Sequence, residues 1–139
     1  MRTVKLNELK ITKINSDGEF IPHPIWKSDY YEALALSDKD IYEGYHQKLQ
    51  KHHYSRAGAK MNEMSFSEFE DLYQDISSNG FKIQEPHIDI SEDNIVLDGQ
   101  HRVVILYLID PFAELTIDEE GHVIGYDQIY NQKRRSSNT

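Results

Sequence analysis

The chain has 139 residues, no cysteine and a formal net charge of −9, with 38% hydrophobic and 28% charged residues. This size and composition indicate one globular domain, and the lack of cysteine excludes disulfides and thiolate catalysis. The acidic charge argues against DNA as a partner, because proteins that neutralise DNA phosphates are normally basic at least locally. With no membrane-length apolar run and no secretory signal at the N-terminus, we expect a cytoplasmic protein.

The first 26 residues indicate short extended segments. Apolar residues alternate imperfectly over residues 4–14, which predicts one or two strands. Ser16-Asp17-Gly18 then predicts a turn. Two prolines within residues 20–26 predict an extended, irregular segment.

The next segment combines helical patterns with many aromatic residues. Ser28 or Asp29 is expected to cap a helix over residues 30–36, and a second helix is expected over residues 41–53, before a loop over residues 54–63. The aromatic side chains here are those of Trp26, Tyr30, Tyr31, Tyr42, Tyr45 and Tyr54. We expect them to pack this segment onto the rest of the domain; the alternative is a lid over a bound base or sugar.

The clearest helix start in the chain is Ser65. Ser65 and Glu68 have the spacing of a capping box, and an apolar face follows at Phe66, Phe69, Leu72, Tyr73 and Ile76. Gly80 is expected to end this helix.

The second half alternates strands with one further helix. Strands are expected over residues 81–90 and 95–97, and again over 113–117 and 122–126 after a stop at Asp110-Pro111. A last helical turn is expected over 129–135. Mixed strands and helices in this order predict the α+β class.

The most informative stretch joins the strand at 95–97 to an apolar helical segment that ends at Ile109. Asp98-Gly99 predicts a tight turn, and Gln100, His101 and Arg102 follow directly. A helix that starts after such a turn presents free backbone N–H groups and partial positive charge, which favour a phosphate. Arg102 can add a bidentate fork and His101 a further donor. The alternative is an ordinary turn with solvated His and Arg side chains.

Asp98-Gly99-Gln100-His101-Arg102 resembles the signature of the ParB/sulfiredoxin-like superfamily. Members carry Asp-Gly-x-His-Arg, Gly-Glu-Arg-Arg or Gly-Cys-His-Arg between a strand and a helix. The resemblance extends upstream to the helix over residues 66–76, its Asn79-Gly80 end and the strand over residues 85–90. Gln100 stands where the sulfiredoxin branch has its reactive cysteine, so that branch is excluded.

The resemblance implies a single domain over residues 1–139. It would hold a small mixed sheet packed with helices, a helical insertion at about residues 20–64 and a basic tail at about residues 133–139. It covers residues 65–110 well and residues 1–15 loosely.

The resemblance also implies the site. Gly99, Gln100, His101 and Arg102 would bind the phosphates of ATP or another nucleotide, and Asp98 would shape the turn or face Mg²⁺. Asp98, His101 and Arg102 form the expected catalytic set, with Arg102 foremost; no residue is assigned as a resident metal ligand.

A general base is not evident. Some small-molecule kinases of the superfamily carry Pro-His-Glu with the Glu as base, whereas His23 here is followed by Pro24. Glu19, Asp29 and Glu32 are nearby candidates.

Four further histidines are candidate ligands. His46, His52 and His53 lack a carboxylate or a third histidine at metal-binding spacing, so a solvated helix surface is expected for them. His87 is a candidate for lining the cleft, because the family topology places it one strand from the motif.

The expected function is phosphotransfer from a nucleotide to a small hydroxyl substrate, with Mg²⁺. The alternative is a nucleotide-dependent binding module or switch of the ParB type, which could act as a homo-oligomer. A nuclease is the weakest alternative, because the sequence shows no paired metal carboxylates. DNA and membranes are not expected as partners.

Overall fold

The computed structural model describes residues 1–54 and 64–129 and has the expected α+β class. Almost all of the loop expected over residues 54–63, and the C-terminal tail with its helical turn after residue 129, lie outside the described residues. The helices are α1 (Asp29–Leu36), α2 (Lys39–Leu49), α4 (Phe66–Asn79) and α5 (Gln100–Ile109). The strands are β1 (Arg2–Lys5), β2 (Lys10–Ile14), β3 (Phe20–Pro24), β4 (Asp89–Ile90), β5 (Val96–Asp98), β6 (Glu114–Ile117) and β7 (Val123–Asp127).

The strands do not form the single mixed sheet that was expected. Within the described residues they form three small antiparallel sheets, ordered β1-β6-β7, β2-β3 and β4-β5. A parallel bridge between Lys10 and Ile95 joins the second sheet to the third, and an antiparallel bridge between Asp89 and His122 joins the third to the first. The strands are two to five residues long, so each backbone ladder ends before a continuous sheet can form.

The expected bounds of two segments were wrong, and both segments contain proline. Residues 20–24 form a true strand, with Pro22 opposite Thr12 and Pro24 opposite Lys10. An edge strand tolerates proline, which has no N–H to donate. The helical part of the insertion therefore begins only after residue 24, with a 3-10 helix over Ile25–Lys27 that precedes α1. Of the strand expected over residues 81–90, only β4 is present; residues 82–86 are exposed and bury no sheet face.

The capping predictions are confirmed. Ser28, not Asp29, caps α1, because its Oγ accepts a hydrogen bond from the Tyr31 N–H at 3.1 Å. The capping box of α4 is complete, with the Glu68 N–H donating to Ser65 Oγ and the Ser65 N–H donating to Glu68 Oε1, both at 3.1 Å. These caps satisfy N–H groups that a helix start otherwise leaves unpaired.

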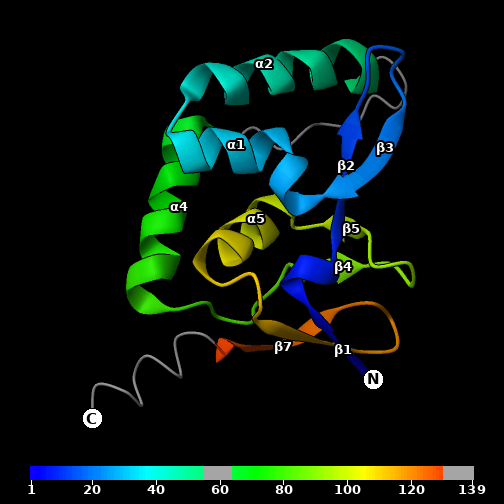
Figure 1. The fold of residues 1–139 in the computed structure, drawn as a ribbon, viewed down its shortest axis with the longest axis vertical. Coiled ribbons are helices and arrows are strands. Elements are labelled where there is room, and N and C mark those ends of the chain that lie inside the picture. The colour runs from blue at the N-terminus through cyan, green and yellow to red at the C-terminus, as the bar shows by residue number, and fades with distance from the viewer. Residues whose placement is uncertain (55–63, 130–139) are drawn as a thin grey trace.

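Helix α5 lies at the centre of the molecule, with α1, α2 and α4 on one side and the strands on the other (Figure 1). Its residues Val103, Val104, Ile105 and Leu106 are completely buried, which explains its near-continuous apolar sequence. Within residues 1–54 and 64–129, no helix has the length and apolar character needed to cross a membrane.

The aromatic side chains of the segment around α1 and α2 mostly pack into the core, as expected. Tyr30, Tyr42 and Tyr45 are buried, and Tyr30 lies in contact with both of the others and with Phe69 of α4. Trp26 differs, because 53% of its surface is exposed.

Candidate functional site

A cavity of about 590 Å³ lies at the start of α5. All five motif residues, Asp98 to Arg102, line it. The rest of the lining comes from Thr12 and Phe20 of the β2–β3 hairpin, Met64, residues 84–86, Leu97 and side chains of α1, α2 and α4. This volume lies within the range of cavities that bind small molecules.

The motif folds as the sequence predicts. Strand β5 ends at Asp98, Gly99 adopts φ +88°, and α5 begins at Gln100. The Asp98 carboxylate accepts a hydrogen bond from the Gly99 N–H at 2.9 Å, which is the turn-shaping role. The N-cap residue of α5 is Gly99, which has no side chain to accept from the first N–H groups of the helix, so among the described residues these groups, with the positive end of the helix dipole, are available to an anion.

Gly99 is required by backbone geometry. Its φ of +88° lies in the left-handed region that favours glycine. A Cβ at this position would lie 2.9 Å from Ile88 Cγ1 and 3.3 Å from Arg102 Nη2. Other side chains of the protein therefore fill the space beside Gly99. A residue without a side chain is needed at this position to allow that packing.

Arg102 carries the positive charge of the cavity. The side chain is half-buried, and burial lowers the pKa of its guanidinium while the carboxylates of Asp98 and Asp89 act to raise it. Arginine stays protonated in such surroundings, so a fixed cation with a forked set of donors faces the cavity. Gln100 lies beside it, with Nε2 at 3.4 Å from Thr12 Oγ1.

His101 is held in an aromatic cluster and differs from the expected phosphate donor. The residue is 8% exposed, and burial, assisted by the neighbouring His46, lowers the pKa of its imidazole to about 4. Its Nε2 lies 3.0 Å from the Tyr42 hydroxyl, which itself donates to the Met64 carbonyl at 2.5 Å. The hydroxyl has one proton, so Nε2 must be the donor and Nδ1 an acceptor. The ring Nε2–H therefore donates to Tyr42. The backbone N–H is the group of His101 that can donate to a phosphate.

The candidate general bases are not at this cavity. Asp29 lies 3.5 Å from the Lys13 ammonium group, and Glu32 lines a separate hollow of about 470 Å³ with His23 and Trp26. Among the described residues, Glu85 and Asp98 are the carboxylates that line the motif cavity. Sequence reasoning missed Glu85 as a carboxylate of the site, because residues 81–90 were expected to form a strand and His87 was the residue of that strand expected at the cleft.

The other histidines are also placed differently from the expectation. His46 is not a solvated surface residue: its Nε2 lies 3.1 Å from the Tyr30 hydroxyl, and burial lowers its pKa. His87 does not line the cavity and stacks on His122, with ring centroids 4.7 Å apart. Within the part of the chain that the structure describes, no group of three or more His, Asp or Glu side chains could hold a metal ion.

Comparison of the chain with protein-family models, with curated proteins and with solved structures gave no match.

Proposed function

We propose that the cavity at the start of α5 binds a nucleotide, and that the protein is a cytoplasmic ParB/sulfiredoxin-like phosphotransferase acting on a small hydroxyl substrate. The observation that carries this proposal is that the uncapped N-terminus of α5 and the Arg102 guanidinium meet at one cavity of about 590 Å³. Backbone N–H groups, a helix dipole and an arginine together form a donor set suited to phosphate.

The walls of the cavity fit the rest of a nucleotide. Phe20, Tyr30, Leu49 and Leu72 contribute apolar and aromatic surface, while Gln100 and Gln84 contribute amides. In this proposal the phosphates lie at the motif turn, and the base or sugar lies against the apolar side. Arg102 would neutralise charge on the transferred phosphoryl group.

The net charge of the cavity lining affects whether the nucleotide is bound with or without Mg²⁺. Glu85 and Asp98 are acidic, Arg102 is basic and His101 is neutral, so the described lining has an excess of one negative charge. A nucleotide whose phosphates carry Mg²⁺ is repelled less than a free one. Because the described residues offer no three-ligand metal group, the magnesium would be held by the phosphates, where it offsets their charge.

Glu85 is the best candidate for the general base. Asp98 is bonded to the Gly99 N–H, whereas the structure gives Glu85 no hydrogen bond or ion pair among the described residues. An exposed carboxylate at the cavity can accept a proton from an acceptor hydroxyl that comes within hydrogen-bond reach.

Thermal-shift measurements test the binding step. ATP, ADP, CTP, GTP and AMP, each with and without Mg²⁺, are compared on wild type, Arg102→Ala and Arg102→Lys, with Lys27→Ala as a control outside the motif cavity. A nucleotide at 100 times its Kd stabilises the folded state by about 2.7 kcal/mol. We expect one nucleotide to raise the Tm of wild type and Lys27→Ala, less so in Arg102→Lys, and not in Arg102→Ala. No shift with any nucleotide would exclude the proposal.

Turnover distinguishes a kinase from a switch. The nucleotide that binds is incubated with a panel of small hydroxyl compounds, and nucleoside diphosphate release is measured. A kinase consumes nucleotide only when its acceptor is present, and Glu85→Gln is expected to lower kcat without weakening nucleotide binding, because it removes a negative charge from the lining. Binding without consumption, combined with a change in oligomeric state, would favour the ParB-type switch.

A further inference from the structure

A second hollow, of about 470 Å³, lies apart from the motif cavity. It is the hollow that His23, Trp26 and Glu32 line, and none of the motif residues Asp98 to Arg102 lines it. Its walls come from the β2–β3 hairpin, the 3-10 helix over Ile25–Lys27 and α1. This volume also lies within the range of cavities that bind small molecules.

The β2–β3 hairpin separates the second hollow from the motif cavity. Thr12 and Phe20 lie on one face of the hairpin and line the motif cavity. Lys13 and His23 lie on the opposite face and line the second hollow, because successive residues of a strand point to opposite sides. The two cavities are therefore separate binding spaces on opposite faces of the same hairpin.

The second hollow exposes apolar and aromatic surface. Trp26 is 53% exposed and Leu36 is 64% exposed, although both are large apolar side chains that line the hollow. Tyr31 adds a ring that packs edge-on against Tyr107, with centroids 5.5 Å apart. Exposed apolar side chains grouped around a hollow are typical of a surface that a ligand covers, and two aromatic side chains favour a ligand with a ring.

The charges around the second hollow favour an anion. Lys13 Nζ lies 3.5 Å from Asp29 Oδ1, and an ammonium group has three N–H donors, so donors remain for a ligand. Lys27 Nζ lies 5.1 Å from the centroid of the Trp26 ring and has no ion pair among the described residues. With Glu32 as the carboxylate of the described lining, the two lysines leave an excess of one positive charge.

We propose that the second hollow binds a small aromatic carboxylate, with its ring against Trp26 and Tyr31 and its carboxylate at Lys13 and Lys27. A single negative charge balances the lining, whereas a dianion would leave an excess of negative charge beside Glu32. This site does not depend on the proposed function, because it shares no lining residue with the motif cavity.

Phenylacetate is the probe that tests the site. Trp26 is the only tryptophan of the chain, so a change in tryptophan fluorescence reports directly on the second hollow. Line broadening of the NMR signals of the probe gives a second measurement that does not need Trp26. We expect both signals to saturate with the same Kd. Phenethyl alcohol, which has the ring without the charge, is expected to bind about threefold more weakly, the scale of an exposed ion pair. Acetate, which has no ring, is expected to leave the fluorescence unchanged. The proposal is overturned if phenylacetate gives no saturable change, or if either analogue binds as tightly as phenylacetate.

Variants of opposite charge change test the assigned contacts. Lys13→Met is expected to weaken phenylacetate binding about threefold, and Glu32→Gln to tighten it by a similar factor, because one loses an attractive charge and the other a repulsive one. Lys39→Met is the matched control, since Lys39 is an exposed lysine that lines neither cavity. Trp26→Ala is expected to abolish the line broadening.

The direction of the two charge effects decides the result. An unchanged Kd in both Lys13→Met and Glu32→Gln, or a change in the same direction in both, would contradict the assignment of the carboxylate to the lysines. Lys13→Met also removes the partner of Asp29; if that variant does not fold, the exposed Glu32→Gln decides the matter alone. No nucleotide is present in these measurements, so their outcome and that of the nucleotide screen are independent.

Discussion

The Tyr42 hydroxyl lies 3.0 Å from His101 Nε2 and so connects α2 to the first turn of α5. The same hydroxyl donates to the Met64 carbonyl, directly before the cap of α4. Tyr30 lies against the imidazole with ring centroids 4.5 Å apart, and Phe69 packs edge-on at 4.9 Å. One hydroxyl thus ties three helices together and sets the tautomer of a histidine that lines the candidate site.

Replacement of Tyr42 by phenylalanine tests this connection. Tyr42→Phe leaves the Met64 carbonyl and the His101 N–H without their partner, so we expect a loss of about 1–2 kcal/mol in the free energy of unfolding, measured with urea. Tyr31→Phe is the matched control, because the structure gives the Tyr31 hydroxyl no hydrogen bond among the described residues. Equal stability of the two variants would contradict the assigned role, and the nitrogen shifts of the His101 ring report whether its tautomer becomes mixed.

The buried, neutral His101 predicts an acid-sensitive fold. Its pKa is lowered from 6.5 to about 4, so between these values the unfolded chain binds a proton that the folded chain does not. The corresponding stability is present above pH 6.5 and is lost as the pH falls toward 4, by on the order of 3 kcal/mol. Urea unfolding across this range should show the loss. His101→Gln should flatten the slope, and an unchanged slope would show that another group is responsible; His46 acts in the same direction.

Gly99 and Gly44 have different surroundings, so replacement of each by alanine tests the backbone requirement at the motif turn. Gly99→Ala must adopt φ +88° and place a Cβ 2.9 Å from Ile88 Cγ1, so we expect a destabilisation of about 1–2 kcal/mol or more. Gly44→Ala lies within α2 with nothing within 4 Å of the new Cβ, and should stabilise by about 0.5–1 kcal/mol. Chemical denaturation of both variants measures the difference, and a neutral Gly99→Ala would contradict the assigned backbone requirement.

The capping box of α4 gives a further prediction. Ser65→Ala removes the acceptor for the Glu68 N–H, so we expect a loss of about 1 kcal/mol in the free energy of unfolding. Ser67→Ala, two residues later on an exposed position of the same helix, should be neutral or slightly stabilising, because alanine is the better helix former. If both variants behaved alike, the cap would contribute nothing measurable.

Features that depend on neighbouring residues could be predicted from the sequence. The Ser65–Glu68 capping box, the turn at Asp98-Gly99, the start of α5 and the α+β class all follow from patterns a few residues long. The same holds for the turn role of Asp98, since an aspartate before glycine is within reach of the next N–H.

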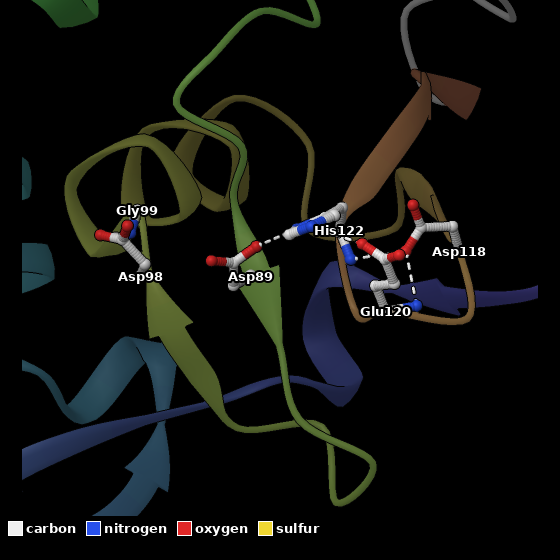
Figure 2. Close-up of polar contacts among 6 residues, drawn as sticks. All are labelled: Asp89, Asp98, Gly99, Asp118, Glu120 and His122. Atoms are coloured by element: carbon white, nitrogen blue, oxygen red, sulfur yellow. Dashed lines mark hydrogen bonds and ion pairs between the residues drawn. The ribbon is translucent and has the colours of Figure 1, made fainter.

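The tertiary structure decided the properties that depend on residues far apart in the chain. His101 is neutral because burial among aromatic side chains excludes water from it and because His46 of α2 disfavours a further positive charge, while Tyr42, 59 positions away, sets its tautomer. Asp89 faces His122, 33 positions away, only because an isolated antiparallel bridge joins Asp89 of β4 to His122, the residue directly before β7 (Figure 2). Local sequence fixes a helix cap because its partners are covalent neighbours, whereas the charge of a side chain depends on burial and on contacts that exist only after the chain has folded.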